Sequence, residues 1–264
     1  MRFLAICMMA FAVVGCASAP VDDPEAMAEY ERDNDPLEPT NRAIFDFNQV
    51  LDTAILKPVA EGYRFVLPAK ARESVHNFLF NLSEPWTFVN DLLQGQFMRA
   101  LNTFGRFTMN STFGLFGLFD AASEVGWQPH KEDFGQTMAV WGVGEGPYLM
   151  LPVLGPSNPR DLVGRVVDFF ADPFNLWVNA SNQDWAGTSR LVLNVIDTRE
   201  RLLTPLDDLK TTSLDFYISI RSMTRQIRES EVRNKELPDD QLPSLSSVPE
   251  VMQLNYDFTG NGSQ

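Results

Sequence analysis

Apolar side chains recur every three or four residues through most of the chain between positions 41 and 228. The segment 96–111 is the clearest case, because Phe97, Leu101 and Phe104 share one helical face. Its opposite, polar face carries Arg99, Asn102, Arg106 and Asn110. Such spacing is that of α-helices with one apolar and one polar face, and it predicts a mainly α fold.

Prolines and glycines set the expected helix boundaries, because proline lacks the backbone N–H of a helix interior and glycine commonly ends helices. Pro58 should end the first helix, Pro68 should begin the second, and the pair Glu84–Pro85 should begin a third. Gly95 should end that third helix. The predicted helices are 41–56, 68–82, 84–94, 96–111, 159–170, 185–203 and 207–228.

One segment, 140–148, does not fit the helical pattern. It places Gly142, Gly144 and Gly146 at alternate positions, followed by Pro147 and Tyr148. Alternate glycines leave one side of an extended chain without side chains and allow positive φ. We predict a small glycine-rich hairpin or loop. A phosphate-binding loop is excluded, because the segment lacks lysine and the sequence Gly-Lys-Ser/Thr.

The first sixteen residues resemble a bacterial lipoprotein signal sequence. Arg2 precedes an apolar stretch at 3–14 that is too short to span a bilayer and suits a signal peptide. Gly15 and Cys16 match the end of a lipobox, so we expect cleavage after residue 15 and acyl chains on Cys16. The alternative is an ordinary secretory peptide cleaved near Ala19. Because no aspartate follows Cys16, the outer membrane is the expected destination.

Cysteine usage and charge exclude disulfides, thiol catalysis and nucleic-acid binding. Only Cys7 and Cys16 occur, so the mature domain has no disulfide and no catalytic thiol. Acidic, proline-containing stretches predict a tether at 16–35 and a mostly disordered tail at 229–264, on either side of a helical domain at 36–228. The formal net charge of −14, without a long Lys/Arg cluster, excludes a nucleic-acid partner.

No catalytic motif is present. The sequence contains neither Gly-x-Ser-x-Gly nor His-Glu-x-x-His, and its only histidines are His76 and His130. We expect His76 to be a capping or packing residue, and the segment 130–133 to form a charged surface turn. A metal or acid–base role for 130–133 is the alternative. The sequence therefore predicts no enzyme, no metal site, and no cofactor besides the covalent lipid on Cys16.

Two stretches, 107–119 and 146–158, carry no charged residue. Both are shorter than the roughly 20 residues that a membrane-spanning helix needs. Segments of this kind are suited to lie along one leaflet of a bilayer. The alternative interpretation is an ordinary apolar core of a globular helical domain.

An ordered series of motifs resembles one protein family. The motifs include DPLEPTNR at 35–42, NLSEP at 81–85, VNDLLQG at 89–95, TFGRF at 103–107, DFGQT at 133–137, WGVG at 141–144, GPY at 146–148 and GPS at 155–157. The series covers about 35–175 and is similar to that of the VacJ family, the MlaA lipoproteins. The resemblance implies a ring-like bundle of amphipathic helices that lies in the periplasmic leaflet of the outer membrane and surrounds an amphipathic channel.

The resemblance also implies an activity and partners. Phospholipid that has strayed into the outer leaflet would pass through the channel to a periplasmic shuttle protein, which maintains lipid asymmetry. A trimeric porin would bind the ring. The alternatives are a structural or adaptor lipoprotein that binds a porin without transport, and a lipid-modifying enzyme, which the lack of a recognisable nucleophile disfavours.

Two sets of residues are candidates for this task. Arg99, Asn102, Arg106 and Asn110 are predicted to line the channel, where an arginine would pair with lipid phosphate. An ordinary surface face is the alternative for this set. Gly142, Gly144, Gly146, Pro147 and Tyr148 are predicted to act as a gate, with a static turn as the alternative.

Overall fold

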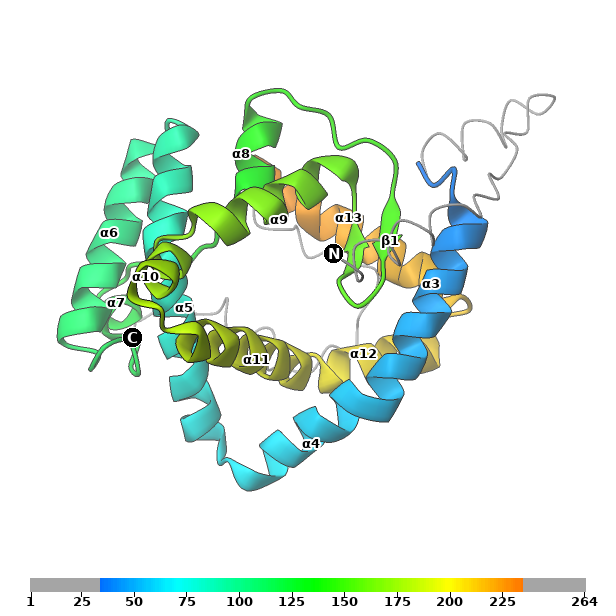
Figure 1. The fold of residues 1–264 in the computed structure, drawn as a ribbon, viewed down its shortest axis with the longest axis horizontal. Coiled ribbons are helices and arrows are strands. Elements are labelled where there is room, and N and C mark those ends of the chain that lie inside the picture. The colour runs from blue at the N-terminus through cyan, green and yellow to red at the C-terminus, as the bar shows by residue number, and fades with distance from the viewer. Residues whose placement is uncertain (1–33, 235–264) are drawn as a thin grey trace, which may run out of the picture.

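The computed structural model describes residues 34–234 of the protein (Figure 1). The predicted signal peptide, Cys16, most of the predicted tether, and the tail from residue 235 onward lie outside the described residues. The first half contains α3 (Glu38–Leu51), the π-helical turn η2 (Asp52–Leu56), α4 (Lys57–Val66), α5 (Ala69–Leu93), α6 (Phe97–Thr112) and α7 (Ala121–Glu124). The second half contains α8 (Phe134–Val140), β1 (Leu149–Leu151), β2 (Gly155–Ser157), α9 (Pro159–Ala171), α10 (Pro173–Ser181), α11 (Asp184–Arg201), α12 (Leu203–Thr212) and α13 (Phe216–Arg233).

The helices follow one another around a ring. In Figure 1, α3 and α4 form one side, α11 and α12 run across the front, and α5, α9 and α13 complete the circuit. The predicted fold class, a mainly α ring-like bundle, is confirmed. None of the described helices combines the length and the apolarity that a bilayer crossing requires.

The only sheet among the described residues is a two-stranded antiparallel hairpin, in which Leu149 pairs with Ser157 and Leu151 with Gly155. Two asparagines of α3 hold it in place. The Asn48 side chain donates to the Leu151 carbonyl at 2.9 Å, and the Asn41 Oδ1 accepts from the Met150 N–H at 2.9 Å. The predicted small hairpin therefore exists, and the glycine-rich segment is the loop that leads into it.

One compact apolar cluster joins the two ends of the described chain. Phe45 of α3 and Met150 of β1 pack with residues of α12 and α13. The cluster consists of Phe45, Tyr148, Met150, Leu209, Tyr217 and Ile220. Beside it, the buried Asp35 carboxylate accepts a hydrogen bond from Arg221 at 3.0 Å and another from the Tyr217 hydroxyl. Asp35 therefore belongs to the folded domain, although it was predicted to lie in the tether.

Two predicted proline boundaries are wrong. The chain continues helically past Pro58, because the π-helical turn η2 precedes α4 and Pro58 lies in the first turn of α4, where a missing N–H is tolerated. Pro85 lies inside α5, which is continuous from Ala69 to Leu93. The neighbouring Glu84 is buried in an ion pair with Arg106 of α6, and this tertiary contact favours a continuous helix over the local preference of proline.

The C-terminal helix prediction also needs correction. The predicted helix 207–228 is split into α12 and α13 at residues 213–215, where Asp215 accepts from the Ile218 N–H and pairs with Arg42 at 2.8 Å. A side-chain cap of this kind starts a new helix. Helix α13 extends to Arg233, so the predicted tail begins later than residue 229. Helices α6, α9 and α11 confirm their predictions to within two residues.

Candidate functional site

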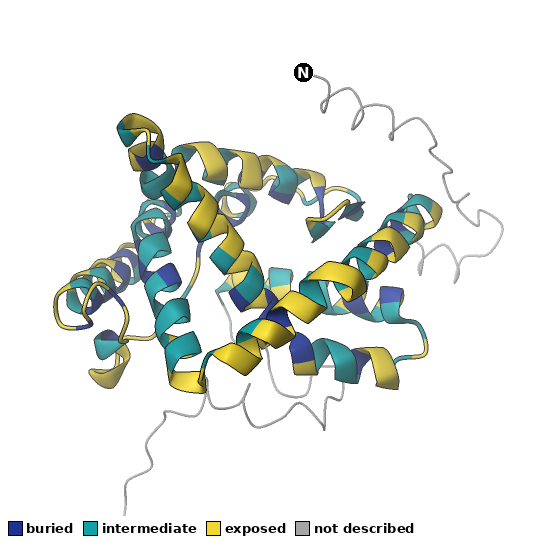
Figure 2. Ribbon diagram, turned by 60° about the horizontal axis from the view of Figure 1, so that its bottom comes forward, coloured by how far each residue is buried: buried dark blue, intermediate teal, exposed yellow. Residues whose placement is uncertain are grey.

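The polarity of the domain is inverted relative to that of a water-soluble protein. Within residues 34–234, twelve apolar residues are buried, whereas twenty-one polar or charged residues are buried. Thirty-seven large apolar side chains of the same region are exposed. Figure 2 shows exposed positions along almost every helix of the ring. Exposed apolar surface of this extent marks a protein that contacts lipid or other proteins.

Helix α6 shows the inversion most clearly. Its outer face exposes Phe97, Leu101 and Phe104 to 67%, 62% and 56%. Its buried positions are Ala100, Thr103, Arg106 and Asn110. The predicted two-faced helix is confirmed, with its apolar side outward and its polar side toward the protein.

The uncharged segment after α6 extends this apolar surface. Phe113, Phe116 and Phe119 are exposed, while Gly114 and Gly117 between them are buried. The segment is bonded back to the end of α6, since the Gly117 N–H donates to the Asn110 carbonyl at 2.8 Å. Three phenylalanine rings thus project from a backbone that the protein fixes, as suits an interfacial segment.

The prediction that Arg106 and Asn110 line an open channel is wrong. Arg106 is 1% exposed and forms ion pairs with Glu84 at 3.1 Å and Asp120 at 3.0 Å. It also donates to the Trp127 carbonyl. Asn110 donates to Asp120 at 3.0 Å and accepts from the Ala122 N–H at 2.9 Å. Both side chains therefore direct their hydrogen bonds to other protein groups, as is usual for buried polar side chains.

Arg99 and Asn102 bind the loop that follows α7. Arg99 donates to the Glu132 carboxylate at 2.7 Å, and Asn102 donates to the Gln128 carbonyl at 2.8 Å. Both side chains remain partly exposed. Their predicted contact with a passing lipid stays a prediction.

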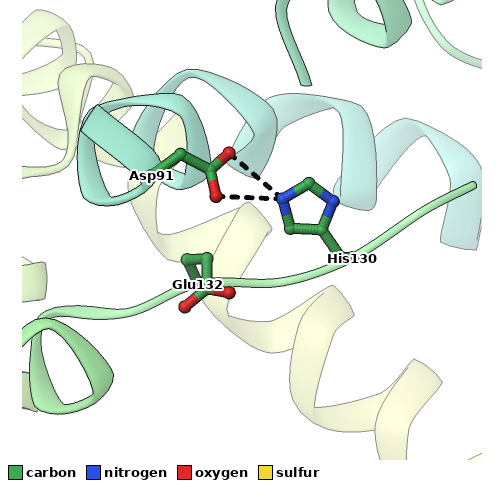
Figure 3. A group of neighbouring side chains, drawn as sticks. All are labelled: Asp91, His130 and Glu132. Carbon is green, nitrogen blue, oxygen red and sulfur yellow. Dashed lines mark hydrogen bonds and ion pairs between the residues drawn. The ribbon is translucent and has the colours of Figure 1, made fainter. Parts of the chain in front are cut away.

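A second polar cluster lies one turn along the same helix pair (Figure 3). The His130 Nε2 lies 3.1 Å from both oxygens of Asp91, and the Thr103 hydroxyl donates to Asp91 at 2.6 Å. Glu132 is 5% exposed and accepts from Gln94 at 2.8 Å. The predicted surface turn at 130–133 is therefore wrong, since this segment supplies buried partners to α5 and α6.

Asp91, His130 and Glu132 bring potential metal-ligand atoms within 4.8 Å of one another. Arg99 is already the cationic partner of this cluster, because it pairs with Glu132 and lies 3.7 Å from Asp91. Hydrogen-bond donors also occupy both carboxylates. The arrangement fits an internal ion-pair network that holds the loop at 128–133 on the helices.

His76 is a packing residue, as predicted. Its Nδ1 lies 2.8 Å from the Asp197 carboxylate of α11, and its ring lies 6.3 Å from that of Phe80.

The predicted gate residues divide into an anchored and an exposed part. Asn34 donates from its side chain to the Gly146 carbonyl at 2.6 Å and accepts from the Tyr148 N–H at 2.8 Å. Tyr148 is buried in the apolar cluster. Residues 142–144 are exposed, and Gly142 has a φ of +90°, which favours glycine. Bending at this segment stays a prediction.

Lys131 is an exposed cation that lies near residues of several helices. The Lys131 ammonium lies 5.4 Å from the centre of the Phe80 ring of α5, and the charges that act on it belong to Asp197 of α11 and Glu231 of α13. Its side chain is exposed to solvent. Burial among these elements nevertheless lowers the pKa of Lys131 below its ordinary value. Lys131 is thus an exposed cation within range of charges on α11 and α13.

A half-buried carboxylate on α9 makes stability depend on pH. Asp168 accepts hydrogen bonds from the Trp86 indole N–H at 2.8 Å and the Phe134 N–H at 2.9 Å. Burial raises the pKa of Asp168 to about 6, although both bonds oppose the shift. The folded protein therefore binds a proton that the unfolded chain releases near pH 4. This contribution is complete below the unfolded pKa and is lost as the pH rises through about 6.

The variant Asp168→Asn isolates this contribution, because the amide oxygen still accepts both bonds and does not titrate. Between pH 4 and 6, the free energy of unfolding of the wild type should fall relative to that of the variant by about 1 kcal/mol per pH unit. Denaturant unfolding at a series of pH values measures the difference. Parallel curves for the two proteins would contradict the raised pKa.

The buried polar face of α5 was not predicted from the sequence. Asn81, Glu84, Thr87 and Asn90 are all buried and recur every three residues. Their regular spacing was visible in the sequence, but polar residues at helical spacing are ordinarily read as a solvated face. Because α6 carries a matching buried polar stripe, the two helices pack through hydrogen bonds, such as that from Thr103 to Asp91.

Comparison with known proteins agrees with this architecture. The sequence profile of the MlaA lipoprotein family matches residues 33–231. The chain is 33% identical over 260 residues to the intermembrane phospholipid transport system lipoprotein MlaA of Escherichia coli, covering 96% of this chain and 97% of that protein. An uncharacterised protein of Rickettsia prowazekii is 36% identical over 203 residues, covering 76% of this chain and 79% of its own.

A solved structure reported under "Structural basis for maintenance of bacterial outer membrane lipid asymmetry" has the same fold. It superposes with a TM-score of 0.67 at 36% identity, covering 75% of this chain and 98% of its own. The sequence match spans almost the whole described region, and the structural match includes the ring of helices. The chain therefore belongs to the MlaA lipoprotein family.

Proposed function

We propose that this protein removes mislocalised phospholipid from the outer leaflet of the outer membrane and passes it to a periplasmic carrier. Acyl chains on Cys16 anchor it, and the ring lies in the periplasmic leaflet. The proposal extends to this chain the transport role in the name of its Escherichia coli relative. It includes a trimeric porin as a partner and involves no catalysis.

The inverted polarity of the ring is the observation that carries the proposal. A lipid head group crosses hydrocarbon only at a cost of many kcal/mol unless polar groups replace its water. Exposed apolar rings on α6 and on the segment after it suit contact with acyl chains. The exposed ammonium of Lys131, which lies near α5 and within range of charges on α11 and α13, suits contact with lipid phosphate. A polar passage with an apolar rim would provide for both halves of the lipid.

Other residues keep their candidate roles within this proposal. Arg99 and Asn102 are partly exposed and remain proposed lining residues. The exposed residues 142–144 remain the proposed bending point of the gate, with Gly146 to Tyr148 as its fixed end. An adaptor that only binds a porin has less support, since the name of the Escherichia coli relative specifies phospholipid transport.

A deletion strain complemented with wild type or Cys16→Ala tests the proposal. An amine-reactive label that cannot cross the membrane measures phospholipid exposed on the cell surface. Wild type should restore a low signal, and Cys16→Ala should leave it high, because stable anchoring requires acyl chains. Ala19→Ser, which alters only the alternative cleavage site, is the control. Equal restoration by Cys16→Ala would exclude the anchor, and no restoration by wild type would exclude the transport function.

A further inference from the structure

A polar pocket lies where α9, α13 and the hairpin meet. Its volume is about 220 Å³, roughly seven times the liquid volume of a water molecule. It therefore has room for a lipid head group and no room for two long acyl chains. Gly146 and Tyr148 at the end of the glycine segment form one wall, and Pro156 and Ser157 of β2 form another. The pocket is thus continuous with the proposed gate.

Two of the three arginines in the pocket are held by carboxylates. Arg228 pairs with Asp133 at 2.6 Å, with Asp161 at 2.8 Å and with Glu231 at 3.0 Å. Arg225 pairs with Glu145 at 2.9 Å. Arg228 holds the pKa values of Asp133 and Asp161 below the ordinary value, against the effect of burial, so both are ionised at neutral pH.

Arg165 is the exception in this pocket. Within the part of the chain that the structure describes, it bonds only to backbone carbonyls, those of Pro156 at 3.0 Å and Leu154 at 3.4 Å. Its side chain is exposed, and burial of its surroundings lowers its pKa. An exposed guanidinium that has free N–H groups and no carboxylate partner among the described residues is well suited to a phosphate.

The pocket also offers a carboxylate for a cation. Glu231 is 43% exposed, and one of its oxygens accepts from Arg228 while the other is free of any described bond. With four acids and three arginines along its wall, the pocket has a net formal charge of −1. A free phosphate dianion is disfavoured by these acids. A ligand with a phosphodiester and a nearby ammonium matches both signs of charge.

We infer that this pocket binds the zwitterionic head group of a phospholipid, with Arg165 contacting the phosphodiester and Glu231 contacting the ammonium. The inference rests on the proposed function and adds a head-group preference to it. Anionic phospholipids without an ammonium bind more weakly, because they face four carboxylates and gain only the contact with Arg165. The pocket shares no lining residue with the Asp91 and Arg106 clusters.

Binding of two short-chain probes to the purified, delipidated full chain in detergent tests the inference. Dihexanoyl phosphatidylethanolamine should bind wild type at least tenfold more tightly than dihexanoyl phosphatidylglycerol. Arg165→Gln should weaken both probes at least tenfold, and Arg165→Lys should recover part of the loss. Glu231→Gln should abolish the preference by weakening only the ethanolamine probe. The matched controls Arg233→Gln and Glu229→Gln alter the exposed pair at the end of α13 and should bind like wild type.

Two outcomes overturn the inference. One is unchanged binding by Arg165→Gln, and the other is equal affinity of wild type for the two probes. If Arg165→Gln shifts the unfolding temperature, the head-group preference of Glu231→Gln is compared with that of Glu229→Gln instead. A preference that is equal in these two variants overturns the inference. Measuring phospholipid on the surface of the complemented deletion strain distinguishes failure of the head-group site from failure of the proposed transport function. Wild type that clears phospholipid but shows no preference retains the proposed function without this site, whereas wild type that neither binds nor clears loses both.

Discussion

Replacing Arg106 with alanine should lower the free energy of unfolding by about 3–5 kcal/mol, because a buried ion pair that loses one partner leaves a buried charge uncompensated. Arg106 is 1% exposed and connects Glu84 of α5 with Asp120 beyond α6. Burial already raises the pKa of Glu84 to about 7, and the Arg106 charge opposes that rise. Glu84 should therefore bind a proton in the variant, while Asp120 and the Trp127 carbonyl lose a donor.

Denaturant unfolding in detergent measures this loss. Arg233→Ala, which breaks the exposed pair with Glu229, is the control and should change the free energy of unfolding by less than about 1 kcal/mol. Arg106→Glu should fold poorly, since three acids would then meet in one buried site. A stable Arg106→Ala protein that fails only in transport would instead restore Arg106 as a channel residue.

A double substitution of Phe97 and Leu101 by glutamate should detach the unacylated chain from lipid vesicles. Both side chains are mostly exposed on the outer face of α6, so few protein contacts would be lost. Removing two large apolar side chains from lipid costs about 3–6 kcal/mol, which corresponds to a partition coefficient lower by roughly 10² to 10⁴. The measurement is vesicle sedimentation in a Cys16→Ala background, because acyl chains would mask the effect.

The matching control for this experiment is Ser189→Glu, which adds an acid at an exposed polar position of α11. Its vesicle binding should remain close to that of the parent. The free energy of unfolding of the double variant in buffer should stay within about 1 kcal/mol of that of the parent, since substitutions at exposed positions have small effects on stability. Vesicle binding that survives the double substitution would mean that α6 does not face the membrane.

The helices themselves were largely predictable from sequence. Segments such as 96–111 and 159–170 have a strong apolar period and clear boundaries, so local chemistry determines them. Pro85 was misjudged because tertiary ion pairing outweighs a local preference, and a single sequence does not show that Glu84 meets Arg106. The boundary at Pro58 was predicted wrongly because a π-helical turn before it allows the chain to remain helical. No residue pattern in the sequence predicts such a turn.

The candidate site was predicted in its general polarity and missed in its details. The two faces of α6 were assigned correctly, but the polar face was assigned to an open channel. In the structure it meets a second polar face, that of α5, and a loop whose residue Glu132 is buried. Arg165 was not predicted as a site residue because its lack of a carboxylate partner depends on how three other chain segments fold. The carboxylates of those segments pair with Arg225 and Arg228 instead. Pairing among distant segments is the information that sequence periodicity lacks.

The polar seam between α5 and α6 has a consequence for how such a domain can evolve. In an apolar core, a substitution that conserves side-chain volume usually costs less than about 1.5 kcal/mol. Here Arg106 is matched to the carboxylates of Glu84 and Asp120, so a change at Arg106 is tolerated only with a compensating change at Glu84 or Asp120. Substitutions in the polar seam should thus be retained in evolution only in complementary sets. The exposed apolar residues of the outer face should instead change independently of one another.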